Sequence, residues 1–188
     1  MQDEKLRERL DARTSIYNGH VINLEKWDVT LPNGKPAMRE VAIHKGASAI
    51  VPVDDEGYVY LVRQFRTPLQ RVLTEVPAGK LDSAGEDHLV AAKRELHEET
   101  GFTAKKWTHL VDLATTPGFC TETISLYLAE GLTRGETDFD DDEFLAPVDI
   151  PLAVLADEVM AGRIPDAKTQ LAVMRVAELL RRRKDGRA

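Results

Sequence analysis

The spacing of hydrophobic residues predicts strands through the earlier part of the chain. Residues 47–53 form an apolar run, and residues 58–65 are rich in β-branched and aromatic side chains, as strands typically are. Residues 21–31 and 38–43 have extended character, and the Pro32-Asn33-Gly34-Lys35 sequence between them favours a tight turn. We therefore expect a β-hairpin ahead of the main domain. Further strands are expected at residues 109–115 and 123–129.

Helical patterns occupy the centre and the end of the chain. Residues 87–99 predict a helix, and Gly101 suits the left-handed conformation that often ends one. Two more helices should close the chain, the first between Pro151 and Gly162 and the second from a cap at Asp166. The highly charged N-terminal residues predict a short surface helix or a loose end.

Composition is that of a soluble globular protein and limits the partners. The chain has 188 residues, 43% of them hydrophobic, so one domain, or one domain with a small extension, can bury a core. No apolar run approaches the ~20 residues that a membrane helix needs. With 25 Lys and Arg against 32 Asp and Glu, the net charge of −7 argues against nucleic-acid binding. The single cysteine, Cys120, excludes an intrachain disulfide and favours a cytoplasmic setting.

The central helix carries the most informative cluster, which consists of carboxylates one turn apart. At about 100° per residue, Glu95, Glu98 and Glu99 fall on neighbouring positions of one face. Carboxylates this close repel each other unless a cation lies among them. An all-oxygen site of this kind suits Mg²⁺ or Mn²⁺, and Arg94 beside it can hold one carboxylate in a bidentate pair. The alternative interpretation is a solvated acidic face.

The residues before this helix favour the metal hypothesis. A Pro77-Ala78-Gly79 turn leads into the helix through a loop that carries Glu86. Glycine at position 79 allows the backbone to approach a ligand closely, which makes the carbonyl of Ala78 a candidate metal ligand.

The segment from Gly79 to Phe102 resembles the Nudix box, the signature of the Nudix hydrolase superfamily. Glu86 and Arg94 have the spacing of the box, and Arg94-Glu95-Leu96-His97-Glu98-Glu99-Thr100-Gly101 matches it throughout. Two positions depart from the pattern. Six residues instead of five separate Gly79 from Glu86, and Phe102 replaces the usual aliphatic residue. The insertion leaves the register of the helix unchanged.

The resemblance extends over roughly residues 14–180 and is to the ADP-ribose pyrophosphatase group. It implies an α/β fold, the Nudix α/β/α sandwich with a mixed sheet. It also implies an N-terminal β-hairpin subdomain over residues 1–45, exchanged between the subunits of a homodimer, and a Nudix domain over residues 46–188. The shared motifs are Arg63-Gln64-Phe65-Arg66, Glu75-Val76-Pro77-Ala78-Gly79, Thr116-Pro117-Gly118-Phe119, the acidic loop Asp140-Asp141-Asp142-Glu143-Phe144 and residues 162–169.

The resemblance implies a divalent-metal cofactor, Mg²⁺ or Mn²⁺, and assigns its ligands. Glu95 and Glu99 are the principal ligands, and the carbonyl of Ala78 is a further one. Glu98 is either another ligand or a group that orients water. Glu86 orients a ligand or Arg94, and its alternative role is to place negative charge at the N-terminus of the helix.

The general base and the substrate contacts are also assigned by resemblance. The base lies in the acidic loop, where Glu143 is preferred and Asp141 and Asp142 are the alternatives. An aromatic face can hold a base by stacking. The candidate substrate-binding residues are Trp27 for adenine, Arg39 for the base or ribose, Arg66 for phosphate or ribose, and Glu122 for the terminal ribose. Core or surface roles are the alternatives for each of the first three.

The implied activity is hydrolysis of ADP-ribose to AMP and ribose 5-phosphate. Pro117, sixteen residues after Gly101, favours this substrate over GDP-mannose or UDP-glucose, which are the alternatives. A catalytically silent, ligand-sensing Nudix domain is a third hypothesis, disfavoured by the intact carboxylates. The expected partners are a small-molecule nucleoside diphosphate sugar and a second copy of the chain, without nucleic acid or membrane.

Overall fold

A computed structural model describes residues 3–83, 85–136 and 144–187 of the chain. The chain divides into two compact units. The first consists of Met1–Gly46 and Ala114–Glu122, and the second of Ala47–Leu113 and Thr123–Ala188. Among the described residues, no helix is both long enough and apolar enough to cross a membrane.

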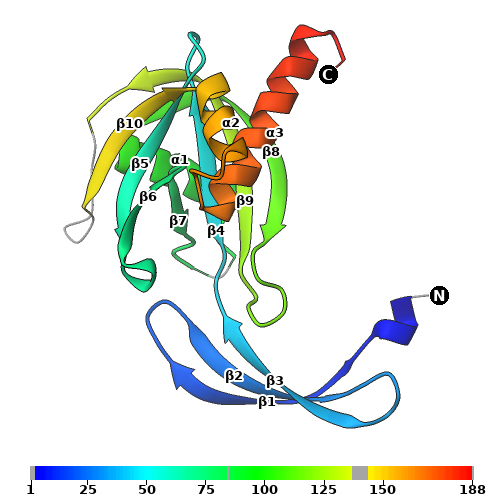
Figure 1. Cartoon of the computed structure of the whole chain (residues 1–188). Helices are drawn as coiled ribbons and strands as arrows, with labels where there is room; N and C mark the ends of the chain where they lie inside the picture. The colour runs from blue at the N-terminus through cyan, green and yellow to red at the C-terminus, as the bar shows by residue number, and fades with distance from the viewer. Residues whose placement is uncertain (1–2, 84, 137–143, 188) are drawn as a thin grey trace. The chain divides into compact units, whose positions relative to one another are not determined.

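The first unit is built on an antiparallel sheet in the order β1-β2-β3, where the sequence predicted a two-stranded hairpin (Figure 1). The turn before β3 forms as expected, with Gly34 at a φ of 80°. The N-terminal residues were expected to form a short helix or a loose end. Asp3–Leu6 form a short helix, but the expectation was wrong from Arg9 onwards, where β1 begins. The side chains of β1 are exposed along the whole strand, so no burial pattern marks it, and backbone pairing with β2 forms it. The elements are η1 (Asp3–Leu6), β1 (Arg9–Asn18), β2 (Asn23–Thr30) and β3 (Pro36–Ile43).

The segment Ala114–Glu122 joins the first unit through β3. Ala42 and Cys120 form a parallel bridge. The N–H of Ala42 donates to the carbonyl of Phe119 at 2.7 Å, and the N–H of Thr121 donates to the carbonyl of Ala42 at 2.9 Å. Backbone pairing therefore fixes the loop that contains Pro117 against the sheet.

The second unit contains a mixed seven-stranded sheet. Its main path runs β10-β5-β4-β9-β8, while β6 pairs with β5 and β7 with β4. The β4–β9 pair is parallel, and the β4–β5 and β5–β10 pairs are antiparallel. The strands are β4 (Ala47–Val53), β5 (Tyr58–Arg66), β6 (Arg71–Glu75), β7 (Ala78–Lys80), β8 (Phe102–Ala114), β9 (Thr123–Arg134) and β10 (Leu145–Pro151), with a short helix η2 (Thr67–Leu69).

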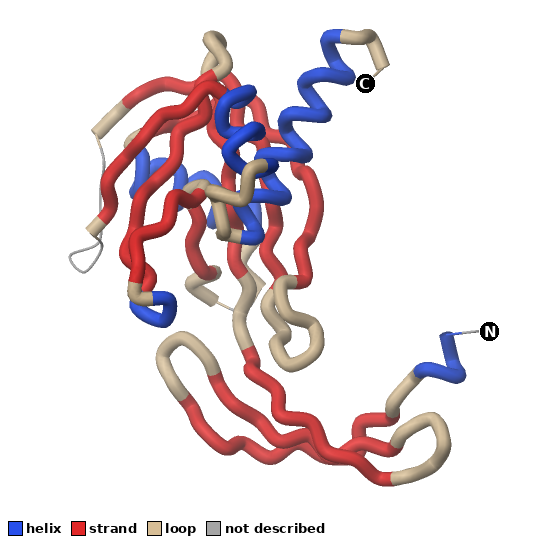
Figure 2. The backbone as a smooth tube through the Cα atoms, viewed as in Figure 1, coloured by secondary structure: helices blue, strands red, loops and turns tan. Residues whose placement is uncertain are grey.

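Helices cover both faces of this sheet, α1 (His88–Thr100) on one and α2 (Leu152–Met160) with α3 (Ala167–Lys184) on the other (Figures 1 and 2). Alternate residues of β4 face two separate cores because successive side chains of a strand point to opposite faces. Val51 packs in the core that contains α2 and α3, whereas Ile50 packs with Leu96 of α1. This arrangement is the predicted α/β/α sandwich with a mixed sheet.

The ends of the helices follow the predicted chemistry, with one correction. The carboxylate of Asp87 accepts the N–H groups of Leu89 and Val90, and Gly101 ends α1 at a φ of 72°. Asp166 caps α3 as expected. Pro151, however, ends β10 rather than filling the first position of α2, because β10 pairs with β5 up to that residue. Strand β10 was not predicted, because Pro147 interrupts its apolar residues and Pro151 ends it.

Candidate active site

The carboxylates of α1 differ in burial. Glu95 is 7% exposed and Glu99 is 4% exposed, whereas Glu98 is half-buried. Leu96, between them in sequence, is fully buried and holds the helix on the sheet. Two of the predicted ligands are therefore not on a solvated acidic face. Buried carboxylates need hydrogen-bond donors or cations, because an unpaired buried charge is costly.

Strand β7 supplies part of that support. Ala78 and Gly79, which were predicted to form a turn, are its first two residues and pair with Ala49 and Ser48 of β4. A Cβ atom at Gly79 would lie 2.0 Å from the carboxylate carbon of Glu95, so only glycine allows the observed approach. The N–H of Ala78 donates to Oε2 of Glu99 at 3.1 Å. The Ala78–Gly79 backbone therefore lies directly against both buried carboxylates.

Arg94 binds two carboxylates rather than the one that was predicted. Its Nη1 donates to Oε1 of Glu95 at 2.7 Å and to Oε2 of Glu98 at 3.1 Å. Its Nη2 donates to the carbonyl of Lys80 at 3.2 Å. Burial lowers the pKa of Arg94, but the charges of the surrounding carboxylates, Glu95 first, outweigh this effect and raise it. The guanidinium thus neutralises this side of the cluster.

Glu86 lies near Arg94 and the loop. Its Oε1 is 3.8 Å from Nη2 of Arg94, and its Oε2 accepts the N–H of Asp82 at 2.6 Å. The carboxylate of Asp82, which the sequence analysis did not single out, lies 3.5 Å from Nε of Arg94. The position of Glu86 suits an orienting role for Arg94, which stays a prediction.

The atoms of the candidate metal ligands are of the kind that bind a divalent ion. In the described parts of the chain, no three acidic, histidine or cysteine side chains are arranged to hold a metal. Arg94 binds Glu95 and Glu98, and the N–H of Ala78 binds Glu99. All the candidate ligands are oxygens, which Mg²⁺ and Mn²⁺ prefer. Glu95, Glu98, Glu99 and the Ala78 carbonyl remain the predicted ligands.

Arg66 belongs to an ionic cluster around a buried carboxylate, that of Glu75. Its Nε and Nη2 each donate at 2.7 Å to one oxygen of Glu75, which is 2% exposed. Lys168 also binds Glu75. Burial raises the pKa of Glu75, but the hydrogen bonds and charges of Arg66 and Lys168 outweigh it and bring the pKa to about 2. Glu75 and Lys168 lie in two of the motifs shared with the Nudix family, and neither was predicted to have a role.

Trp27 and Arg39 lie in one row across the sheet of the first unit. Arg13 on β1 pairs with Trp27 on β2, which pairs with Arg39 on β3. The guanidinium of Arg13 lies over the Trp27 ring, 4.5 Å from its centroid. Nε1 of Trp27 donates to Glu25 at 2.6 Å. The sequence analysis missed Arg13 because β1 itself was not predicted.

The remaining candidates fall in different places. Nδ1 of His44 lies 3.5 Å from Oε1 of Glu122, within the first unit. Asp141, Asp142 and Glu143, the candidate general bases, lie outside the described residues. Of the predicted substrate-binding residues, only Arg66 belongs to the same unit as the carboxylates of α1.

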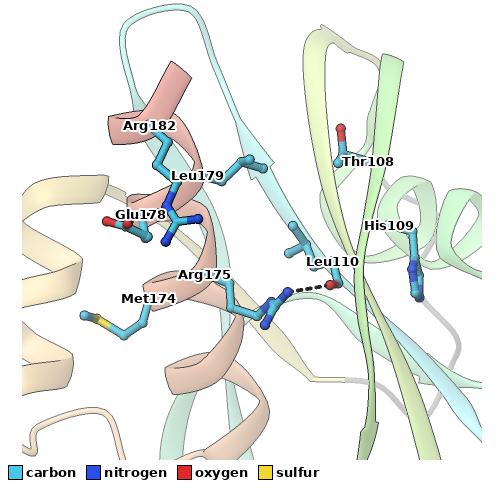
Figure 3. Close-up of a pocket in the computed structure, with 8 residues that line it drawn as sticks. All are labelled: Thr108, His109, Leu110, Met174, Arg175, Glu178, Leu179 and Arg182. Atoms are coloured by element: carbon cyan, nitrogen blue, oxygen red, sulfur yellow. Dashed lines mark hydrogen bonds and ion pairs between the residues drawn. The ribbon is translucent and has the colours of Figure 1, made fainter. Parts of the chain in front are cut away.

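A pocket of about 470 Å³ lies between β8 and α3 (Figure 3). Arg175 reaches from α3 and donates to the carbonyl of Leu110 at 2.8 Å. Arg182 donates to Glu178 at 2.6 Å. Protein groups thus bind both arginines of the pocket, and its lining shares no residue with the carboxylate cluster.

The sandwich fold, with the backbone of β7 packed against two buried carboxylates of α1, defines a class of protein. The model of the NUDIX domain matches residues 42–167, and the chain therefore belongs to the Nudix family. Members of this family generally use divalent metal ions.

Several known proteins are similar over most of the chain. The ADP-ribose pyrophosphatase of Bacillus subtilis (strain 168) is 42% identical over 90% of this chain and 92% of its own length. The methanol dehydrogenase activator of Bacillus methanolicus is 41% identical, with the same shares of both chains covered. A crystal structure of an ADP compounds hydrolase, at 25% identity, matches with a TM-score of 0.81 over 97% of this chain and 98% of that one.

Proposed function

We propose that the protein hydrolyses ADP-ribose to AMP and ribose 5-phosphate with a divalent metal ion, Mg²⁺ or Mn²⁺. The observation that carries this proposal is the packing of the Ala78–Gly79 backbone against the buried carboxylates of Glu95 and Glu99. The similarity to an ADP-ribose pyrophosphatase over most of both chains supports the choice of substrate.

Glu95 and Glu99 would hold the metal, with Glu98 and the carbonyl of Ala78 as further ligands. When bound, the ion neutralises the diphosphate and lowers the pKa of a water molecule. Arg94 pairs with Glu95 and Glu98 and thereby limits their repulsion.

The other residues bind and orient the reactants. Glu143, or Asp141 or Asp142 in the same loop, would accept the proton of the attacking water. Arg66 presents a cationic side chain for a phosphate oxygen. Water adds to one phosphorus, the bridging oxygen leaves with the other phosphate, and the two monophosphates are released.

The first unit would bind the nucleoside and form a homodimer interface. Trp27 offers an aromatic face to adenine, Arg39 and Arg13 flank it, and Glu122 would contact the terminal ribose. The sheet exposes apolar side chains on β1, including Ile16 and Tyr17. A second copy that covers them would remove apolar surface from water. A reducing, cytoplasmic setting fits the single cysteine.

Product chromatography after incubation with a substrate panel tests the proposal. The panel is ADP-ribose, GDP-mannose, UDP-glucose, NADH and diadenosine tetraphosphate, each with Mg²⁺ and with EDTA. We expect AMP and ribose 5-phosphate from ADP-ribose, formed fastest in the panel and only with metal. Faster turnover of GDP-mannose or UDP-glucose would keep the chemistry and replace the substrate. Binding of ADP-ribose without turnover of any member would contradict the proposal and favour a ligand-sensing domain.

A further inference from the structure

The segment from Glu75 to Gly79 is held at every residue. Thr169 on α3 accepts the N–H of Val76 at 2.9 Å, and the carbonyl of Pro77 accepts the N–H of Ile50 at 2.9 Å. The contacts of Ala78 with Glu99 and of Gly79 with Glu95 complete the series. The first turn of α3 is thus connected through this segment to the carboxylates of α1.

Glu75 is the charged anchor at the start of that segment. Lys168, with its side chain 11% exposed, binds Glu75 and also lies 3.1 Å from Asp166. Asp166 in turn accepts the hydroxyl of Thr169 at 2.6 Å. Lys168 therefore contacts two carboxylates, one on β6 and one at the cap of α3, and it shares the charge of Glu75 with Arg66.

The bidentate pair fixes one edge of the Arg66 guanidinium and leaves the other available. Nε and Nη2 are used by Glu75, and among the described residues no partner binds Nη1. The side chain of Arg66 is 40% exposed, whereas that of Glu75 is 2% exposed. The hydrogen bond with Glu75 is the main cause that raises the pKa of Arg66, and burial opposes it. The charge of Glu99 makes a smaller contribution in the same direction as the hydrogen bond. Arg66 is therefore within electrostatic range of Glu99.

We propose that Glu75, held by Lys168, is a positioning residue that fixes the Arg66 guanidinium and keeps its Nη1 edge available to a phosphate of the substrate. The fork of two parallel hydrogen bonds defines the plane of the guanidinium, which a single bond would not do. Lys168 offsets part of the charge of Glu75, so that Arg66 keeps a net attraction for phosphate. The inference rests on the proposed ADP-ribose hydrolysis.

A purely structural role is the competing interpretation, because a buried charge that loses its partner destabilises a fold whatever its function. The two roles differ in how Glu75 and Arg66 combine. If Glu75 acts through Arg66, the catalytic effect of changing Glu75 disappears once Arg66 is absent. A structural defect would lower activity by the same factor with or without Arg66.

A double-mutant cycle on the full-length protein tests this with Glu75→Gln, Arg66→Ala and the double variant. Glutamine keeps the shape of the side chain but turns one acceptor into a donor, so the fork cannot form. We expect Glu75→Gln to lower kcat/KM for ADP-ribose about tenfold in the unmodified background and less than about twofold in the Arg66→Ala background. Arg66→Ala leaves Glu75 paired with Lys168, so no buried charge is stranded.

Glu158→Gln is the matched control. Glu158 on α2 forms the same kind of bidentate pair with Arg163, through Nε at 2.5 Å and Nη2 at 2.7 Å, at an exposed position. Its loss should leave kcat/KM unchanged. Lys168→Met is a second test, used if Glu75→Gln does not fold. It retains the two hydrogen bonds between Arg66 and Glu75 and should raise KM for ADP-ribose severalfold.

Three results would each overturn the inference. They are an unchanged kcat/KM in Glu75→Gln, an equal loss of kcat/KM in both backgrounds, and an unchanged KM in Lys168→Met. Failure of the unmodified protein to hydrolyse ADP-ribose is a different result, because it would overturn the proposed function itself.

Discussion

The backbone of Gly79 touches the carboxylate of Glu95 so closely that a methyl group at position 79 would lie 2.0 Å from the carboxylate carbon. The neighbouring N–H of Ala78 donates to Glu99. One dipeptide of β7 thus contacts both buried carboxylates of α1. The distance also explains why position 79 is glycine, which carries no side chain to displace the carboxylate.

Replacing Gly79 with alanine should therefore displace Glu95 and abolish most activity. We expect kcat to fall at least about a hundredfold, with a destabilisation of about 1–3 kcal/mol from the steric overlap. Steady-state kinetics and thermal unfolding measure the two effects. Gly118→Ala, where the added methyl meets no atom within 4 Å, is the stability control and should leave Tm unchanged. Full activity of Gly79→Ala would contradict the role of Glu95.

Glu99→Gln should remove activity while it preserves the fold. The amide oxygen can still accept the N–H of Ala78, so the buried side chain stays paired, but it no longer offers a charged ligand to a metal. We expect kcat to fall about a hundredfold or more. Mg²⁺ should also raise Tm less in this variant than in the unmodified protein, since ligands that bind only the folded state stabilise it. Full activity with an unchanged Mg²⁺ response would exclude Glu99 as a ligand.

Glu75 should make stability depend on pH at the acidic end. Its pKa of about 2 in the folded protein lies below the usual 4.5, so the folded state favours the charged form. This contribution is complete above pH 4.5, amounts to about 3 kcal/mol, and is lost as pH falls towards 2. Urea unfolding at pH 7 and at pH 3 measures the free energy of unfolding of the unmodified protein and of Glu75→Gln. The difference between the two proteins should be larger at pH 7 than at pH 3.

Glu178→Gln is the control for that measurement. The pKa of Glu178 is also lowered to about 2, by Arg181 and Arg182, but its carboxylate lies on the exposed side of α3. Solvent screens such pairs, so its substitution should change the unfolding midpoints little at either pH. If Glu75→Gln and the unmodified protein differ in free energy of unfolding by the same amount at both pH values, Glu75 is not the source of the pH dependence.

The sequence predicted those parts of the fold and site that local chemistry determines. The caps at Asp87 and Asp166, the turn at Gly34 and the register of α1 follow from short-range patterns. The strand β1 was missed because all its side chains are exposed and leave no burial pattern in the sequence. The strand β10 was missed because it pairs with β5, which is distant in the chain. The roles of Glu75 and Lys168 were missed for the same reason, since residues 93 positions apart meet only in the folded chain.

Trp27 in the first unit is the candidate residue for stacking on adenine. If the Trp27 ring stacks on adenine, Trp27→Ala should raise KM for ADP-ribose about tenfold or more and change kcat much less, because base stacking on an aromatic side chain is worth about 1–3 kcal/mol. Trp27→Phe should recover most of the loss. Arg13, whose guanidinium covers the ring, must move aside or sandwich the base, so Arg13→Ala should change KM and leave kcat near its original value. Trp107→Phe is the control, because that ring packs edge-on against Tyr127 in the second unit. Equal KM values for Trp27→Ala and the unmodified protein would assign Trp27 to the sheet's own packing and leave adenine to other residues.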